Sequence, residues 1–327
     1  MTALLGTGRA LPAHSVTNDE LATFIDTSDE WIYSRTGIHS RHYVKEETAL
    51  SLSAKAARQA LDAAGVQPEE LALIICATFT ADNITPSLSC ELMMELGASC
   101  PAFDLNAACS GFIYASKTAL ALVPDKPVLV LGCEIMSRVI NFEDRGTCIL
   151  VGDGAGAAVY GPSTAGGAVL ASQLHAYPDE KHSIIIEGVS GGTIDGEGWY
   201  FRDKFSQTAS RPKFQMNGAE VYKFATRALT NELQTCLASI DMTPDQVDWY
   251  IPHQANIRII KTAADMLKQP LDKFFVNIDK TGNTSAASVI IALDEFLRTN
   301  DKVERGQILA LSAFGGGLTS ATMILRY

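Results

Sequence analysis

A cysteine in the segment DLNAACSGFIYASKTALALV could act as a nucleophile. Cys109 follows a short strand expected over 102–105 and a turn of small residues, and it begins an almost wholly apolar helix expected over 110–123. A thiol at a helix start lies near the positive end of the helix dipole and near free backbone N–H groups, which favour the thiolate. The small neighbours leave room for a substrate. A buried structural cysteine is the alternative interpretation.

Two polar residues in the second half of the chain could assist such a nucleophile. His253 lies in WYIPHQANIRII, between an expected buried strand and an expected helix. The C-terminal edge of a strand is where sites in α/β sheets gather. Asn283 lies in DKTGNTSAASVIIALDEFL, where a loop ends before an amphipathic helix. Each also has a structural interpretation, because a lone histidine is usually structural and asparagine is a common N-cap.

Two glycine-rich stretches could bring backbone close to a ligand. FGGGLTS at 314–320 exposes N–H donors but lacks the Gly-Lys-Ser/Thr of a Walker loop. GDGAGAA at 152–158 is similar to a dinucleotide fingerprint, but the residues after it form a strand pattern rather than a helix. We therefore expect no nucleotide fingerprint at either place.

The elements that must position these residues alternate between strand and helix. Buried strands are expected at 71–77 and 128–132, with the apolar helix at 110–123 between them and Pro124 after it. This alternation predicts an α/β fold with buried strands.

An internal repeat divides the chain. ALDAAGVQPEELALIICA at 60–77 aligns with CLASIDMTPDQVDWYIPH at 236–253, so that Pro68 pairs with Pro244 and Ile75 with Ile251. GDGAGAAVYG at 152–161 aligns with GGGLTSATMI at 315–324. The repeat predicts two related halves, 1–165 and 166–327, joined near the segment PSTAGG.

Composition narrows the classes of function. The chain has 327 residues, 47% of them hydrophobic, and a net charge of −11, which argues against binding to nucleic acid or to an anionic membrane surface. No apolar run reaches the length of a membrane span, and the N-terminus lacks the basic region of a signal peptide. Seven cysteines without metal spacing predict reduced thiols and no structural metal. We expect a cytoplasmic protein.

Taken together, the motifs resemble one family. DLNAACSGF, GDGAGAAV, PHQANIRII, GNTSAAS and FGGGLT occur in the order seen in β-ketoacyl-acyl-carrier-protein synthase III, and TSDEWIYSRTGIHSRHY at 27–43 is similar to that family's N-terminal motif. The resemblance covers almost the whole chain. It implies the thiolase fold, five αβαβα layers from two duplicated halves, usually as a homodimer. It also implies condensation of an acyl-CoA with malonyl-acyl-carrier protein to start fatty-acid synthesis, without a cofactor.

The resemblance also implies a role for each matching residue. Cys109 would take the acyl group, and His253 and Asn283 would bind the malonyl thioester and stabilise its enolate. The backbone N–H groups of Cys109 and Gly316 would form an oxyanion hole. The remaining implied positions are the CoA-binding residues Trp31, Arg35, Arg145, Gly218 and Asn256, the carrier-protein docking residue Arg258, and the acyl-pocket residues Thr85 and Phe314. Basic residues near the expected entrance, which would attract an acidic carrier protein, are Arg211, Lys213, Lys223, Arg227, Lys261 and Lys268.

The sequence departs from the family pattern at four places. Leu318–Ala321 read LTSA where the family usually has FTWG, and Asp265 stands where some relatives carry a lysine. Thr85 stands where some acetyl-specific members have a phenylalanine that caps the partner's acyl pocket, so we expect longer or branched acyl groups to fit. The segment 188–212 matches poorly and is expected to be a variable loop.

Three other functions share parts of this pattern. A biosynthetic thiolase needs a second catalytic cysteine near the C-terminus, and none follows Cys236. A starter synthase or acyltransferase of secondary metabolism would carry the same motifs. A non-catalytic partner subunit would typically have lost the nucleophile.

Overall fold

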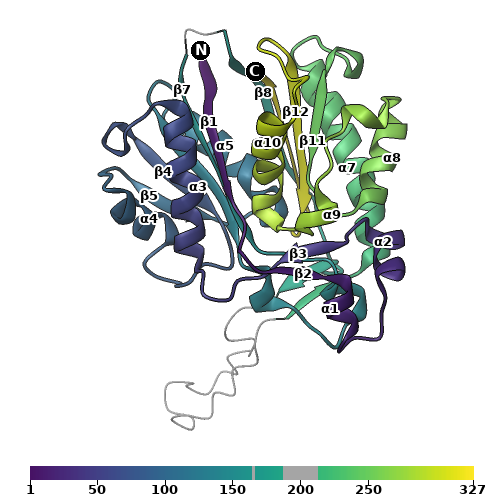
Figure 1. The fold of residues 1–327 in the computed structure, drawn as a ribbon. Helices are drawn as coiled ribbons and strands as arrows, with labels where there is room; N and C mark the ends of the chain where they lie inside the picture. The colour runs from purple at the N-terminus through teal and green to yellow at the C-terminus, as the bar shows by residue number, and fades with distance from the viewer. Residues whose placement is uncertain (164–165, 187–212) are drawn as a thin grey trace, which may run out of the picture.

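A computed structural model describes residues 1–163, 166–186 and 213–327. Two central sheets organise the chain (Figure 1). The first has the order β1 (Thr2–Ala10), β7 (Gly154–Pro162), β6 (Val128–Glu134), β4 (Leu73–Ala77) and β5 (Ala102–Leu105). The second has the order β11 (Trp249–Pro252), β12 (Ile308–Gly315), β13 (Thr319–Arg326) and β8 (Ala168–Ala176). Two short ribbons pair β2 (Ser15–Thr17) with β3 (Ser40–His42) and β9 (Ile184–Ile186) with β10 (Phe214–Met216).

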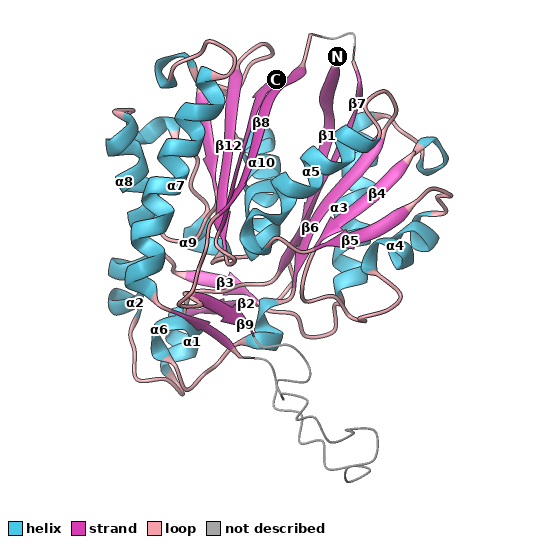
Figure 2. Cartoon of the chain, turned by 180° about the vertical axis from the view of Figure 1, so that it is seen from behind, coloured by secondary structure: helices cyan, strands magenta, loops and turns pink. Residues whose placement is uncertain are grey.

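Helices form three layers around the two sheets (Figure 2). The α-helices are α1 (Asn18–Ala22), α2 (Asp29–Thr36), α3 (Ala49–Ala64), α4 (Leu88–Leu96), α5 (Gly111–Leu122), α6 (Arg145–Cys148), α7 (Gly218–Ala238), α8 (Ile257–Leu267), α9 (Ile278–Thr281) and α10 (Ser288–Thr299). The 3-10 turns are η1 (Pro68–Glu70), η2 (Ala108–Ser110), η3 (Met136–Val139), η5 (Pro244–Gln246), η6 (Leu271–Lys273) and η7 (Ser285–Ala287). Helix α3 covers the outer face of the first sheet and α7 that of the second, while α5 and α10 lie between the sheets.

Local sequence explains why these elements form where they do. Every residue of β4 and β6 is buried, as expected for strands covered on both faces. Helix α3 begins at a capping box made by Thr48 and Ser51 and ends at Gly65, whose left-handed backbone suits a C-cap. Its alanine-rich face lies so close to β1 that a Cβ at Gly6 would come within 2.4 Å of the Ala60 carbonyl oxygen. Glycine at this position allows the helix to pack tightly on the sheet.

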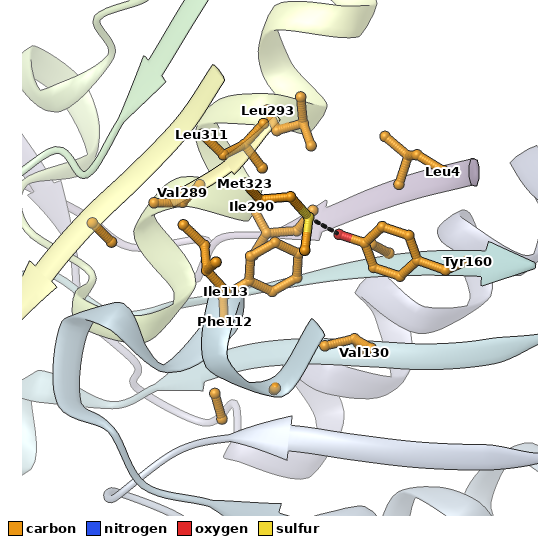
Figure 3. Close-up of a cluster of buried hydrophobic side chains, with 14 of the residues drawn as sticks. Leu4, Phe112, Ile113, Val130, Tyr160, Val289, Ile290, Leu293, Leu311 and Met323 are labelled. Atoms are coloured by element: carbon orange, nitrogen blue, oxygen red, sulfur yellow. Dashed lines mark hydrogen bonds between the residues drawn. The ribbon is translucent and has the colours of Figure 1, made fainter. Parts of the chain in front are cut away.

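Apolar side chains of both sheets and of the two middle helices meet in one continuous core (Figure 3). Tyr160 of β7 and Met323 of β13 meet there, and the tyrosine hydroxyl donates to the methionine sulfur over 3.9 Å. Phe112 of α5 and Ile290 of α10 are buried in the same cluster. This core fixes the position of the turns that precede α5 and α10 relative to one another.

The two sheets have matching strand arrangements. In each sheet the order includes an antiparallel outer strand (β1 or β8), its antiparallel neighbour (β7 or β13), a central strand (β6 or β12) and a parallel strand (β4 or β11). The aligned Pro-acidic segments form the equivalent turns η1 and η5, each with proline at its start. The boundary at 165/166 stays a prediction, since residues 164–165 lie outside those described.

The expected elements are present with small differences in length. The strand expected at 71–77 begins at Leu73, the strand expected at 128–132 continues to Glu134, and the helix expected at 110–123 covers Gly111–Leu122. The stretch GDGAGAAVYG leads into β7, not a helix, as predicted. In the described ranges, no helix is long and apolar enough to cross a membrane.

Candidate active site

The turn that holds Cys109 is tightly packed and locally strained. Strand β5 leads into η2, in which Ala108 has a φ of 47°, a conformation that non-glycine residues rarely adopt. Gly315, at the end of β12, lies against this turn. A Cβ at Gly315 would come 2.7 Å from the Cys109 nitrogen. The second sheet therefore buttresses the turn that presents the thiol.

The environment of the Cys109 thiol differs from the sequence prediction. We expected the helix start to favour the thiolate, but burial raises the pKa of Cys109 to about 11. The residue precedes α5 and lies within η2. The hydroxyl of Ser285, 3.2 Å from Sγ, lowers the pKa in opposition to burial, whereas the carboxyl of Glu134 raises it. Desolvation is the largest of these influences on the pKa of Cys109.

His253 directly follows β11, and its ring is almost completely buried, with 1% of the residue exposed. Its backbone N–H donates to the Ser312 carbonyl over 2.8 Å, which ties it to the central strand β12. Neither ring nitrogen has a hydrogen-bond partner in the described part of the chain, and the ring meets Phe314 edge-on at 5.3 Å. Burial lowers the pKa of His253 to about 3. The imidazole is therefore neutral and can donate one N–H to a ligand.

Asn283 is held through both its backbone and its side chain. Its N–H donates to the Leu150 carbonyl over 2.8 Å, and its own carbonyl accepts from Gly152 over 3.0 Å. Its Oδ1 accepts from the Ser285 backbone N–H over 2.8 Å. This bond spans Thr284 and leaves the side-chain NH₂ as a donor, but Asn283 is not an N-cap as the structural interpretation expected, since the N-caps of η7 and α10 are Thr284 and Ala287.

A single pocket of about 370 Å³ brings the three predicted catalytic residues together. Cys109, His253, Asn283 and Phe314 line it, although 174 positions separate Cys109 from Asn283 in the chain. The walls are mostly apolar, contributed by Ile149, Leu150, Phe214, Val221 and Ile259. Such a pocket suits an apolar group carried to a reactive thiol.

The residues expected to bind CoA lie at the same pocket. Trp31, Arg35, Gly218 and Asn256 line it directly, and Arg145 borders it beside Gly146. The guanidinium groups of Arg35 and Arg145 lie 4.4 Å and 4.5 Å from the centre of the Trp31 ring. An adenine that stacked between Trp31 and Arg145 would have to displace the Arg145 guanidinium from the Trp31 ring. The Arg145 side chain also donates to the Asp26 carbonyl over 2.8 Å.

Arg258 lies exposed at the start of α8, beside this group of residues. Its guanidinium donates to the Ser34 carbonyl over 2.7 Å, and Asn256, the N-cap of α8, donates to the Arg35 carbonyl over 3.1 Å. These bonds join α8 to α2. Other exposed basic residues on neighbouring elements are Lys213, Lys223, Arg227, Lys261 and Lys268. Arg211 and the loop expected at 188–212 lie outside the described residues.

Besides Arg145 and Arg258, two further predicted positions do not line the pocket. Gly316 follows β12, and a Cβ added there would come nearest to the Ile184 side chain, whereas one added at Gly315 would come nearest to the Cys109 nitrogen. Thr85 is exposed on the loop before α4, next to Ile84, which is 85% exposed. Thr85 is not among the residues that line this chain's pocket, and its role in a partner's pocket stays a prediction.

Sequence reasoning missed two residues near the thiol. Ser285 is fully buried against Cys109, but GNTSAAS drew attention only to its asparagine. Glu134 is fully buried at the end of β6, and burial raises the pKa of its carboxyl to about 8. The sequence did hold a signal for Glu134, because an acidic residue ends the otherwise apolar strand VLVLGCE.

Comparison with known proteins identifies the family. The models of 3-oxoacyl-[acyl-carrier-protein] synthase III and of its C-terminal part match residues 103–178 and 237–327. A β-ketoacyl-[acyl-carrier-protein] synthase III of Xanthomonas campestris is 43% identical over 330 aligned positions, covering 99% of this chain and 98% of the relative. This chain belongs to the β-ketoacyl-acyl-carrier-protein synthase III family. It is an acyl-transferring condensing enzyme.

Solved structures of the family agree over the full length. The synthase III of Aquifex aeolicus superposes with a TM-score of 0.90 at 40% identity and covers 100% of both chains. The priming β-ketosynthase of the R1128 polyketide pathway gives 0.87 at 35% identity, covering 99% of this chain and 96% of that one. The fold of this synthase is the thiolase fold. Within the described ranges, no group of three or more His, Cys, Asp or Glu side chains could hold a metal ion.

Proposed function

We propose that this synthase condenses an acyl-CoA with malonyl-acyl-carrier protein, using Cys109 as nucleophile and His253 with Asn283 as hydrogen-bond donors. The observation that supports this proposal most directly is the single pocket that all three residues line. The products are a β-ketoacyl-carrier protein, CoA and CO₂. The reaction initiates fatty-acid synthesis.

In the first half-reaction the Cys109 thiolate attacks the acyl thioester. The new carbon–sulfur bond to Cys109 forms as the bond to CoA breaks, and the CoA thiolate takes up the proton that the cysteine lost. The apolar pocket walls hold the acyl chain. Backbone N–H groups of Cys109 and Gly316 are the proposed donors to the carbonyl oxygen in the transition state, where one such donor is worth about 3–4 kcal/mol.

In the second half-reaction the carboxylate of the malonyl group leaves as CO₂. The electron pair of the broken carbon–carbon bond forms an enolate, which attacks the acyl group and expels the Cys109 thiolate. Neutral His253 and the free NH₂ of Asn283 each donate one hydrogen bond to the enolate oxygen. Loss of CO₂ supplies the carbanion, so neither residue needs to act as a strong base.

The proposed partners use the surface around the pocket. Trp31, Arg35, Arg145, Gly218 and Asn256 would hold CoA, and Arg258 would dock an acidic carrier protein despite the negative net charge of the enzyme. We expect a homodimer, in which Thr85 of one chain lines the partner's acyl pocket. The seven free cysteines fit the reducing cytoplasm.

A second candidate function is the priming of a polyketide. The full-length likeness to the R1128 priming ketosynthase favours it, since the same residues would load a different starter onto a different carrier protein. A non-catalytic partner role is disfavoured by the intact Cys109, His253 and Asn283 around one pocket.

Intact mass spectrometry with a panel of acyl-CoAs tests the proposal. Wild type should gain one acyl mass, which malonyl-acyl-carrier protein then discharges as a β-ketoacyl product. Fast turnover of isobutyryl- or hexanoyl-CoA would support a role for Thr85 in admitting larger groups, and a strong preference for acetyl-CoA would overturn it. Discharge to water or to another acceptor without extension would indicate an acyltransferase, and no loading from any CoA would refute the proposal.

A further inference from the structure

Ser285 is in direct contact with the reacting sulfur. Its side chain is completely buried, and its Oγ lies 3.2 Å from Cys109 Sγ. Among the described residues, this sulfur is the one hydrogen-bond partner of the hydroxyl. A buried hydroxyl has two acceptor lone pairs and one donor, so a partner that changes between thiol and thiolate changes which atom donates.

The backbone at Ser285 is held in an unusual conformation. Its φ is 49°, a left-handed conformation that non-glycine residues rarely adopt. Its N–H donates to Asn283 Oδ1 and so supports the turn by itself, without the hydroxyl. The bond between the Ser285 N–H and Asn283 therefore accounts for the backbone conformation of Ser285. It does not account for the contact between the Ser285 hydroxyl and the Cys109 thiol.

The other groups around Cys109 do not favour a thiolate. His253 is neutral because burial lowers its pKa to about 3, so it offers no positive charge. Glu134 is buried on the side of β6, and its carboxyl raises the pKa of Cys109. Among the influences that lower the pKa of Cys109, the Ser285 hydrogen bond is the largest. Once an anion forms on sulfur, the hydroxyl must be the donor.

We propose that Ser285 is a fourth catalytic residue, whose hydroxyl donates a hydrogen bond to the Cys109 thiolate. The inference deepens the proposed function and rests on Cys109 as its nucleophile. The hydroxyl acts twice, because the thiolate attacks acyl-CoA in the first half-reaction and leaves the β-keto product in the second. No additional proton transfer is required, since Ser285 keeps its proton throughout.

Alkylation of Cys109 by iodoacetamide, followed between pH 7 and 9 by peptide mass spectrometry, tests this role. Ser285→Ala removes the hydroxyl and keeps the Cβ, whereas Ser285→Gly removes the hydroxyl and also relieves the positive φ. Hydrogen bonds to charged groups are worth about tenfold or more in an equilibrium. Both variants should therefore alkylate about tenfold more slowly than wild type at each pH, and acylation by acyl-CoA should slow by about the same factor.

Two controls separate this role from a structural one. Ser110→Ala removes the adjacent buried hydroxyl, which bonds to Thr319 Oγ1 over 2.8 Å and to the Ala107 carbonyl over 2.7 Å but not to the thiol. This variant should alkylate at the wild-type rate. Decarboxylation of malonyl-acyl-carrier protein, which needs His253 and Asn283 but no thiolate, should stay within about twofold of wild type in both Ser285 variants.

The outcomes are distinct. Equal alkylation by wild type and both Ser285 variants overturns the inference, and so does recovery in Ser285→Gly alone or an equal loss of decarboxylation. If wild type alkylates but accepts no acyl group from any CoA, the proposed function fails, while the slower alkylation of the variants still shows the hydrogen bond. Slower alkylation and acylation in both variants, with decarboxylation retained, is the result expected.

Discussion

The turn before α5 and the turn before α10 both begin with a non-glycine residue in the left-handed region, Ala108 with a φ of 47° and Ser285 with a φ of 49°. Each is a short 3-10 turn that leads directly into one of the two middle helices. The first turn carries the proposed nucleophile Cys109, and the second carries the hydroxyl of Ser285, which contacts it. The two turns thus share a backbone conformation, and together they bring a thiol and a hydroxyl into contact.

The residues at the ends of the strands near these turns also differ between the two halves of the chain. In the first half, β4 ends at Ala77 and β6 at Glu134, whereas in the second half β11 is followed by His253 and β12 ends at Gly315. The histidine supplies a neutral donor, and the glycine leaves room for the nucleophile turn. Under the proposed function, the first half would carry the acyl group, while the second half would provide hydrogen-bond donors and space for the turn at Cys109.

Removing the nucleophile should produce the largest effect. Cys109→Ala deletes the sulfur that is proposed to form the acyl intermediate, so acyl loading and condensation should fall below detection. Intact mass spectrometry measures the loading. Cys236→Ala, which alters a buried cysteine far from the pocket, is the control and should still load. Loading of the Cys109→Ala variant would show that another residue carries the acyl group.

Filling the space left by Gly315 should have the next largest effect. Gly315→Ala puts a Cβ 2.7 Å from the Cys109 nitrogen, so the turn must move, and a displacement of about 1 Å can cost about 100-fold in rate. Single-turnover acylation should slow by about that factor. Gly167→Ala, whose Cβ would meet its neighbours at an ordinary 3.4 Å, should acylate normally. If Gly315→Ala is acylated at the wild-type rate, then β12 does not support the turn that holds Cys109.

The two half-reactions should respond differently to pH. Because the pKa of free Cys109 is raised to about 11, the thiolate fraction grows about tenfold per pH unit from pH 7 to 9, and alkylation should follow it. Because the pKa of His253 is lowered to about 3, the imidazole stays neutral above pH 5, and decarboxylation should not change between pH 5 and 8. A decarboxylation rate that halves near pH 6.5 would contradict the buried, neutral histidine.

The smallest effect concerns docking. Arg258→Glu reverses an exposed charge beside the pocket and should raise KM for malonyl-acyl-carrier protein several-fold at low salt, with kcat little changed. The difference should shrink as salt screens the charges. Arg305→Glu makes the same charge change at an exposed residue that lies over Tyr327 and is the control. Equal KM values for the two variants would remove Arg258 from the docking surface.

Much of this arrangement could be predicted from the sequence, because it follows from local patterns. The buried strands, the small-residue turn at Cys109 and the strand-to-helix turn at His253 were all placed to within a few residues. The repeat indicated which strands would be equivalent, as Pro68 and Pro244 show.

The remainder depends on contacts between distant segments. The helix-start argument predicted a stabilised thiolate but took no account of burial, which raises the pKa of Cys109. Ser285 is an unremarkable serine until the fold brings it to Cys109. Likewise, the contact of Arg145 with Trp31 joins α6 to α2 and follows no local spacing, whereas the contact of Arg35 with Trp31 is an i,i+4 contact within α2.

The division of labour between the halves is tested most directly by measuring both half-reactions in two variants. Cys109→Ala should not load acyl groups but should still decarboxylate malonyl-acyl-carrier protein. The variant His253→Ala, which leaves the bond between Asn283 and the Ser285 N–H in place, should load acyl groups at close to the wild-type rate and lose decarboxylation by about 100-fold or more. Loss of both half-reactions in each correctly folded variant would contradict the account, because it would mean that the two halves do not act on separate steps.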